Sequence, residues 1–306
     1  MHSEVDFRGR RILLTGATGF VGKHVLASPK FAGADFVTTQ GVDIRDRSSL
    51  EARVAAAKPD YVLHLAAQSF VPRSFQNPAE TIEINVLGTL NLLQALDKVG
   101  FSGRLLYVSS GDVYGAVSDQ ELPIGEAHIP APRNPYAVSK VSAEQLCLQW
   151  QRSSGMDVLI ARPFNHVGPG QDPAFVIPAL ASQVITIAKG LMPAVISAGD
   201  IDVTRDFTDV RDVVSGYSSI LTSGVSGSIY LLCSGVERSV REVLEQLLMM
   251  RGIDAKVVQD PSKFRRAEQR RMVADNELVT RDTGWLPRID WEVTLQDILE
   301  EMESKT

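Results

Sequence analysis

The sequence predicts an α/β protein built on a doubly wound parallel sheet. Short apolar runs alternate with helical patterns from the start of the chain, and a glycine-rich turn follows the first run. The runs are apolar throughout, as in strands that are buried on both faces. Strands that alternate with helices imply right-handed crossovers, which place parallel strands in one sheet with helices over both faces.

The elements of this sheet can be assigned in chain order. Helical patterns cover residues 20–30, 50–57, 79–99 and 136–153, each between two consecutive apolar runs. The strands are expected at Arg11–Thr15, Phe36–Thr39, Tyr61–Ala66, Arg104–Ser109 and Val158–Arg162. After Pro163 several glycines and prolines interrupt the alternation, and two further helices are expected near residues 175–189 and 240–251. We therefore expect a smaller, mixed region folded over the carboxyl edge of the sheet.

Composition and charge exclude several classes of protein. The 306 residues carry a formal net charge of −6 and no long basic run, which argues against a nucleic-acid partner. No apolar run reaches the ~18 residues of a membrane span, and the acidic N-terminus does not resemble a signal peptide. The 2 cysteines lie far apart and the 5 histidines show no metal-ligand spacing, so neither a disulfide nor a metal site is expected. We expect a cytoplasmic protein.

The glycine turn predicts a dinucleotide site. Gly16, Gly19 and Gly22 lie between the first strand and the first helix, where they permit a tight turn, close approach of a pyrophosphate and close packing of helix on strand. The phosphate would lie at the helix N-terminus, where free N–H groups favour an anion. The spacing GxxGxxG can also occur in a turn without a ligand. Its position after a strand favours the Rossmann-type interpretation, with NAD(H) or NADP(H) as cofactor.

The choice between the two cofactors stays open. The second strand ends in Thr38-Thr39-Gln40, without the acidic residue that would bind a ribose 2′-hydroxyl and favour NAD. The next acid, Asp43, begins a segment that we expect beside the adenine. No arginine is clearly placed for a 2′-phosphate either.

A tyrosine and a lysine predict acid–base chemistry. Tyr136 and Lys140 lie one turn apart on one face of a predicted helix. We expect the ammonium group to lower the pKa of the phenol, so that Tyr136 can exchange a proton near neutral pH. Ser110 follows a strand at the carboxyl end of the sheet, where doubly wound folds bind ligands. The YxxxK pattern alone is common in ordinary helices, and its combination with the glycine turn favours catalysis.

Several motifs together resemble the extended short-chain dehydrogenase/reductases that act on nucleotide-sugars. The similarity covers nearly the whole chain and is carried by GATGFVG, HLAAQSFV, INVLGTLNLL, SSGDVYG, NPYAVSK, RPFNHVGPGQ, RDFTDVRDV and TGWLPRI. Within that family, FNHVGPGQ, RDFTDVRD and RRAE are most similar to the GDP-4-keto-6-deoxy-D-mannose reductases, which form GDP-D-rhamnose. The resemblance implies reduction of a C4 keto group with NAD(P)H.

The resemblance also implies roles for individual residues. Ser110 would hold the sugar carbonyl, Tyr136 would protonate it, and Lys140 would also bind the nicotinamide ribose. The cofactor set comprises Gly16, Gly19, Phe20, Val21, Gly22, Asp43, Ile44, Leu65, Ala66, Ala67, Gln68, Val108, Tyr136, Lys140 and Pro163. The substrate set comprises Ser69, Ser110, Gly111, Asp112, Asn165, Arg205, Arg265 and Glu268. Residues 1–165 would form the dinucleotide-binding domain with the catalytic residues, and residues 166–306 mainly the substrate-binding region, with a soft boundary and a return of the chain to the sheet.

Alternatives remain for the activity and for single residues. A GDP-mannose 4,6-dehydratase, another nucleotide-sugar dehydratase or epimerase, and a non-catalytic nucleotide-binding protein share most of these motifs. Asn165 is expected to be buried and could serve only a turn, and Arg205 could form an ion pair with Asp206 or Asp209. The arginines around Arg265 could form a solvated basic face. Amphipathic helices at 79–99 and 136–153 resemble those of a family homodimer, although the same stripes could pack within one subunit.

Overall fold

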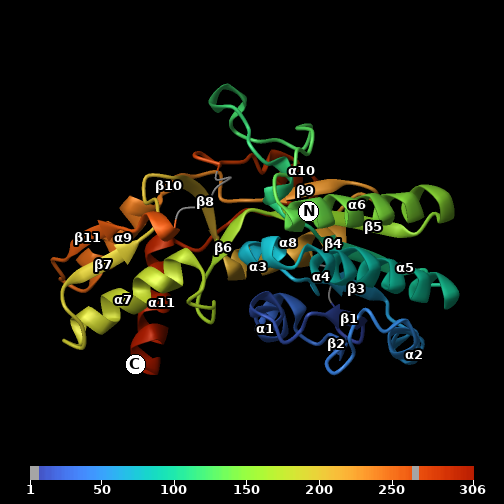
Figure 1. Cartoon of the computed structure of the whole chain (residues 1–306). Helices are drawn as coiled ribbons and strands as arrows, with labels where there is room; N and C mark the ends of the chain where they lie inside the picture. The colour runs from blue at the N-terminus through green and yellow to red at the C-terminus, as the bar shows by residue number, and fades with distance from the viewer. Residues whose placement is uncertain (1–6, 264–268) are drawn as a thin grey trace.

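The computed structural model describes residues 7–263 and 269–306. A parallel sheet of six strands forms its centre, in the order β2-β1-β3-β4-β5-β9 (Figure 1). The strands span Arg11–Thr15 (β1), Asp35–Thr38 (β2), Tyr61–His64 (β3), Arg104–Val108 (β4), Asp157–Pro163 (β5) and Ile229–Leu232 (β9). The doubly wound fold is thereby confirmed. Because β2 and β3 flank β1 on opposite sides, the strand order reverses at β1, and ligands of such sheets bind at that point.

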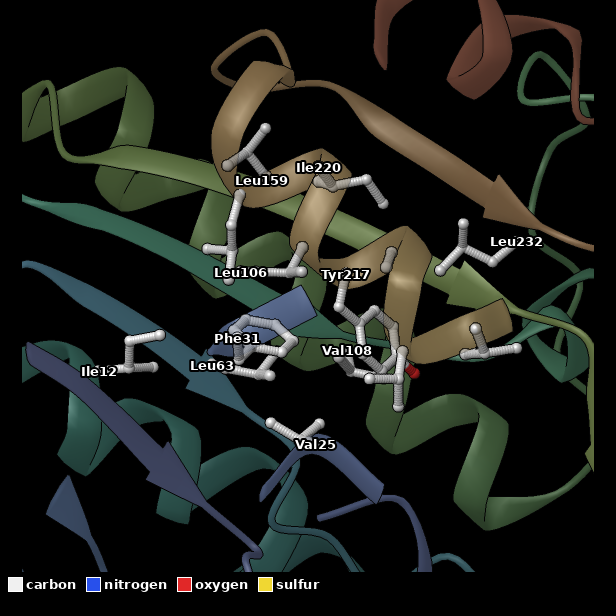
Figure 2. Packing of buried hydrophobic residues seen from close by; sticks show 14 of the residues in the cluster. Ile12, Val25, Phe31, Leu63, Leu106, Val108, Leu159, Tyr217, Ile220 and Leu232 are labelled. Atoms are coloured by element: carbon white, nitrogen blue, oxygen red, sulfur yellow. The ribbon is translucent and has the colours of Figure 1, made fainter. Parts of the chain in front are cut away.

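Helices cover both faces of the sheet because neighbouring strand residues point to opposite sides. On one face, Ile12, Leu63 and Leu106 pack beneath α1 and α8, as Figure 2 shows for Val25 and Tyr217. On the other face, the alternate strand residues pack against α2, α5 and α6. These helices span Phe20–Ala27 (α1), Arg47–Ala57 (α2), Gly88–Lys98 (α5), Pro135–Ser154 (α6) and Val210–Ser223 (α8). A short helix α10, Glu277–Thr283, packs beside α8.

The remaining elements form a second, mixed region with its own apolar core. A three-stranded sheet in the order β10-β8-β6 has one antiparallel and one parallel pairing. A two-stranded sheet pairs β11 with β7, and α7, α9 and α11 pack around the same core. The bounds are Asn165–Val167 (β6), Val195–Ala198 (β7), Thr204–Asp209 (β8), Glu237–Ser239 (β10), Lys256–Gln259 (β11), Val176–Ala188 (α7), Val240–Met250 (α9) and Trp291–Lys305 (α11). A smaller mixed region beside the main sheet is therefore confirmed.

Some predicted elements differ from those observed. The helix expected over residues 79–99 consists of α4 (Pro78–Ile82), a π-helical stretch (Glu83–Leu87) and α5, and it is preceded by α3 (Val71–Gln76). The helix expected to reach residue 30 ends at Ala27, because Pro29 begins a separate 3₁₀ turn whose N-cap is Ser28. The helix α8 and the strand β9 were not predicted, and both return residues after 209 to the main sheet. The division at residue 165 stays a prediction.

Among residues 7–263 and 269–306, no helix combines the length and apolarity needed to cross a bilayer. The same residues contain no group of three or more His, Cys, Asp or Glu side chains placed to hold a metal ion. Cys147 and Cys233 are both buried free thiols.

Candidate active site

The glycine turn forms a backbone cradle at the switch point of the sheet. Gly16 has a φ of +73°, and a Cβ there would lie 2.8 Å from the backbone nitrogen of Ala66. A Cβ on Gly22 would lie 2.3 Å from the carbonyl oxygen of Gly16. Helix α1 then starts after Gly19, without a side-chain cap and without an acidic residue in its first turn. Its N–H groups and positive dipole end can therefore face an anion, which fits a dinucleotide pyrophosphate.

The loop after β3 forms the opposite wall of this cradle, where Leu65, Ala66 and Ala67 are half-buried. The hydroxyl of Thr15 accepts a hydrogen bond from the backbone N–H of Ala66 and lies 2.6 Å from Nδ1 of His64. Nε2 of His64 lies 3.0 Å from the hydroxyl of Thr89 on α5. Burial lowers the pKa of His64 to about 3, with a smaller contribution from the Lys140 charge, so the imidazole is neutral and joins β1 to α5.

Asp43 and Ile44, which were predicted to lie beside the adenine, belong to the segment between β2 and α2. Asp43 is exposed and bonds to Arg45, with 2.6 Å between Oδ2 and Nη2, and this partner lowers the pKa of the carboxyl. Arg45 also lies 3.6 Å from Glu83. Ile44 is buried against Gly88, whose Cβ would meet Ile44 at 2.5 Å. The guanidinium of Arg45 thus has carboxylate neighbours, and the geometry alone leaves the choice between NADH and NADPH open.

Tyr136 and Lys140 meet Ser110 at the carboxyl end of β4. Asn134 caps α6 by accepting a hydrogen bond from the N–H of Ala137, and this fixes where the helix begins. Tyr136 is 8% exposed and its side chain is hydrogen-bonded to that of Ser110. Nζ of Lys140 donates to the carbonyl of Val108 at 2.8 Å and lies 5.8 Å from the ring centre of Tyr136. The structure therefore brings the three predicted catalytic residues together.

The expected direction of the tyrosine pKa shift is wrong for the chain as described. Burial raises the pKa of Tyr136, the Asp112 charge raises it further, and the bond to Ser110 opposes this only partly. The ammonium group of Lys140 bonds to the Val108 carbonyl, 5.8 Å from the ring centre of Tyr136, and does not offset these effects. Burial in turn lowers the pKa of Lys140 to about 8, against the charge of Glu144. A phenol with a raised pKa stays protonated, which is the state that a proton donor needs.

Gly111 and Asp112 follow Ser110 in a 3₁₀ turn that ends at Tyr114. The Ser110 side chain caps this turn by accepting from the N–H of Asp112 at 3.2 Å. The ring of Phe164 lies against Gly111, so that a Cβ there would be 3.0 Å from three ring atoms. A side chain at position 111 therefore has no room beside the Ser110–Tyr136 pair unless Phe164 moves.

A buried amide joins this site to the loop after β3. Asn85, in the π-helical stretch, donates to the carbonyl of Gln68 at 3.0 Å and to the hydroxyl of Ser139 at 2.9 Å. It also accepts from the N–H of Gln68, and Ser139 donates to the carbonyl of Tyr136. Asn85 thus braces the start of α6, while Gln68 is buried and its neighbour Ser69 is exposed.

The predicted substrate residues are only partly placed together. Asn165 and Arg205 lie on the paired strands β6 and β8, where the register joins Asn165 to Phe207. Contrary to expectation, Asn165 is exposed, because β6 lies at the edge of its small sheet. Arg205 is half-buried, and its Nη1 donates to the carbonyl of Thr204 at 2.7 Å. Arg265 and Glu268 lie outside the described residues.

The carboxylates beside Arg205 bind other groups. Asp206 accepts hydrogen bonds from Ser234 and from the N–H of Gly235. Asp209 pairs with Arg211 at 2.7 Å and accepts from Thr294. Two members of the basic cluster near residue 265 also form ion pairs, Arg270 with Asp200 and Arg271 with Glu237.

Several residues that support the site were not predicted from the sequence. The buried pair of Arg162 and Glu144, the ring of Phe164 and the chain Thr15–His64–Thr89 all hold site elements in place. For His64 and Arg162 the signal in the sequence is a polar residue within an apolar run, which does not reveal its partner. His166 stacks on Phe20 with ring centres 6.2 Å apart and planes at 5°, so it packs β6 against α1.

Comparison with known proteins gives a consistent result. Residues 23–302 match a family described as GDP-mannose 4,6 dehydratase. The chain is 48% identical over 299 residues to a GDP-6-deoxy-D-mannose reductase of Pseudomonas aeruginosa, with 97% of this chain and 98% of the relative covered. It is 29% identical over 310 residues to a GDP-mannose 4,6-dehydratase of Vibrio cholerae, with 91% of this chain and 81% of the relative covered.

Solved structures agree with these relatives. RMD from Pseudomonas aeruginosa, complexed with NADPH, has a TM-score of 0.91 at 47% identity, with 97% of this chain and 100% of that chain covered. UDP-glucose 4-epimerase from Thermus thermophilus, in complex with NAD, has a TM-score of 0.86 at 29% identity, with 97% and 100% covered. The glycine cradle, the Ser110–Tyr136–Lys140 group and these matches lead to one assignment: the chain belongs to the GDP-mannose 4,6-dehydratase family of extended short-chain dehydrogenase/reductases.

Proposed function

We propose that this protein reduces the C4 keto group of GDP-4-keto-6-deoxy-D-mannose to give GDP-D-rhamnose, with NADPH or NADH as the reductant. The observation that carries the proposal is the hydrogen-bonded pair of Ser110 and Tyr136 beside Lys140, at the edge of the sheet where the glycine turn lies. The name of the relative at 48% identity and the NADPH bound to RMD support the substrate and the cofactor.

The residues of the site divide the reaction between them. When bound, the reduced nicotinamide supplies a hydride for C4 of the sugar. Ser110 donates a hydrogen bond to the carbonyl oxygen, and Tyr136 donates its proton to the same oxygen as negative charge develops there. The raised pKa of Tyr136 keeps that proton in place until the carbonyl arrives. Lys140, with its positive charge beside the site, stabilises the phenolate that remains and holds the nicotinamide ribose.

A second set of residues would hold the two nucleotides. Gly16, Gly19 and Gly22 form the pyrophosphate cradle of the cofactor, and Asp43 and Ile44 contact its adenine. Arg205 and Arg265 bind the diphosphate of the GDP-sugar, Glu268 accepts from its ribose hydroxyls, and Asn165 also contacts the nucleotide-sugar. An arginine fork suits this task because it bonds to phosphate oxygens bidentately.

A 4,6-dehydratase is the second candidate, because the family description and a relative at 29% identity bear that name. Dehydration removes the C5 proton and expels water from C6, which requires an acid and a base in addition to Tyr136. The residues after Ser110 would have to supply them. Gly111 has no side chain and is covered by Phe164, and Asp112 has a shorter reach than a glutamate. These features favour the reductase.

The test is a comparison of two reactions with the same purified protein. When GDP-4-keto-6-deoxy-D-mannose is supplied with NADPH, and separately with NADH, the protein should consume one equivalent of cofactor. The product should be a GDP-deoxyhexose two mass units heavier than the keto-sugar. GDP-mannose alone should remain unchanged. Formation of the keto-sugar from GDP-mannose, without net consumption of cofactor, would favour the dehydratase instead.

We also propose that the protein is a cytoplasmic homodimer. Leu87 and Val138, on the neighbouring elements that contain the π-helical stretch and α6, are 48% and 42% exposed and could pack against a second copy. The buried free thiols fit a reducing compartment. Light scattering of the wild type should give twice the chain mass of 33.4 kDa, and Val138→Asp should give monomer. Met249→Asp, at an exposed site on α9, serves as the control and should stay dimeric.

A further inference from the structure

One buried arginine connects β5 with the two segments that carry the catalytic residues, the Ser110 turn and α6. Arg162 on β5 is 2% exposed, and its partner Glu144 on α6 is fully buried. Nε and Nη2 of Arg162 donate to the two carboxylate oxygens of Glu144 at 2.8 and 2.6 Å. Nη1 donates to the hydroxyl of Tyr114 at 2.8 Å, and the guanidinium carbon lies 4.9 Å from the centre of the Tyr114 ring.

Each of these residues lies close in sequence to a reacting group. Glu144 follows Lys140 by one helical turn on α6. Tyr114 ends the 3₁₀ turn that Ser110 caps. The Tyr114 ring also stacks on Phe164, with centres 6.3 Å apart and planes at 21°, and Phe164 covers Gly111. A shift of the guanidinium would therefore move the Ser110 turn relative to the catalytic helix.

Stability gives little reason for charged residues at this place. Removing two charges from water costs about as much as their attraction returns, so apolar residues of similar volume often stabilise a fold equally well. Unlike apolar packing, a bidentate ion pair is directional, because its two parallel N–H···O bonds fix the orientation of both partners. Here the fork joins α6 to β5, and the third donor adds the Ser110 turn.

We propose that Arg162, Glu144 and Tyr114 are positioning residues, which hold the Ser110 turn against α6 so that the Ser110 and Tyr136 side chains share one carbonyl oxygen. The proposal rests on the reductase function proposed above. If these three residues only position the reacting groups, their loss should lower kcat and leave the binding of the GDP-sugar and of the cofactor unchanged. A misplacement of reacting groups by about 1 Å can cost ~10²-fold in rate.

Glu144 also acts on Lys140 through its charge. The groups that face Lys140 are Glu144 and Cys147 on its own helix, Tyr107 on β4, His64 on β3 and Tyr136. Burial lowers the pKa of Lys140 to about 8, and the Glu144 carboxylate opposes this shift. Loss of that carboxylate charge therefore lowers the pKa of Lys140 further.

A control pair lies at the opposite end of β5. Arg104 at the start of β4 donates to Asp157 at the start of β5, with 2.8 Å between Nε and Oδ2, and also to the carbonyls of Leu221 and Gly224. This pair also joins two neighbouring elements through a guanidinium and a carboxylate, yet it lies at the amino edge of the sheet, away from Ser110. Asp157→Asn should therefore affect stability alone.

The experiment compares Tyr114→Phe, Glu144→Gln and Asp157→Asn in the full chain. We expect Tyr114→Phe and Glu144→Gln to lower kcat by ~10- to 10²-fold, with KM for the keto-sugar and for NADPH within about twofold of wild type. In Glu144→Gln the alkaline limb of the kcat–pH profile should move to lower pH, because Lys140 loses its proton sooner. In Asp157→Asn both kcat and the pH of the alkaline limb should equal those of the wild type.

Several results would overturn the proposal. Tyr114→Phe removes one oxygen and keeps the ring, so wild-type kcat in this variant contradicts the positioning role even if Glu144→Gln fails to fold. An equal loss of kcat in Asp157→Asn would show that the lower kcat results from general destabilisation of the fold, and would contradict the positioning role. If wild-type protein oxidises no NADPH with the keto-sugar, the proposed function fails on its own. In that case the pKa of Lys140, measured by NMR on labelled lysine, still tests the effect of Glu144 on Lys140. An unchanged pKa of Lys140 in Glu144→Gln contradicts that effect.

Discussion

Replacing Gly16 by alanine tests whether the glycine turn serves a cofactor. Gly16 has a φ of +73°, where an L-residue with a side chain loses ~1–2 kcal/mol. Its new Cβ would also lie 2.8 Å from the Ala66 nitrogen and 2.9 Å from the Leu65 carbonyl carbon, which are backbone atoms that cannot rotate away. The turn and the loop after β3 must therefore separate by some tenths of an ångström. We expect NADPH affinity to fall at least ~10-fold, which corresponds to about 1.4 kcal/mol.

Gly155→Ala provides the control for backbone strain. Gly155 ends α6 with a φ of +74°, and a Cβ there meets nothing within 4 Å. Both variants should lose stability in urea unfolding, and Gly16→Ala should lose more, because it adds the clash with the loop after β3 to the strain of a positive φ. Calorimetric titration should show weak NADPH binding in Gly16→Ala and normal binding in Gly155→Ala, with GDP binding retained in both. If Gly16→Ala binds NADPH as tightly as Gly155→Ala, the cradle does not hold the pyrophosphate and the reasoning is refuted.

Further predictions concern the proton donor, the substrate arginine and acid stability. Tyr136→Phe should lower kcat by ~10²–10⁴ with little change in KM, and near-normal turnover would contradict its assignment as the acid. Arg205→Ala should weaken GDP binding by roughly 1.5–3 kcal/mol in calorimetry while NADPH binding stays intact, and equal loss of both ligands would indicate a structural role. Burial lowers the pKa of His64 from 6.5 to about 3, so its contribution to stability is complete above pH 6.5 and is lost as the pH falls from 6.5 toward 3. Urea unfolding between pH 7 and 4 should show a slope of up to ~1.4 kcal/mol per pH unit from this group, and His64→Gln should remove that part of the slope.

The parallel sheet was predictable because its signals are local. Apolar runs such as Arg11–Thr15 indicate strands that are buried on both faces. The glycine turn after this run indicates the junction between the first strand and the first helix. The positions of Tyr136 and Lys140 on one helix face followed from helical periodicity alone. These inferences required no knowledge of distant contacts.

The parts that were missed depend on distant contacts. The strand β9 and the helix α8 belong to the main sheet only because residues after 209 return to it, and no local pattern states which sheet a strand will join. The pKa of Tyr136 was expected to fall because Lys140 is its neighbour in sequence. In three dimensions Lys140 bonds to the Val108 carbonyl and burial of the phenol dominates.

The return of α8 and β9 has a consequence for synthesis of the chain. While only residues 1–165 have left the ribosome, the face of the sheet that contains Leu106 and Ala161 lacks α8, and β5 lacks its outer neighbour β9. An apolar face and an unpaired strand edge are sites of aggregation. The nascent sheet therefore stays unfinished until residue 232 emerges, and a chaperone that shields apolar surface would act in that interval. Stalled chains ending before α8 should be trapped by such a chaperone, and chains that extend well past β9 should be released.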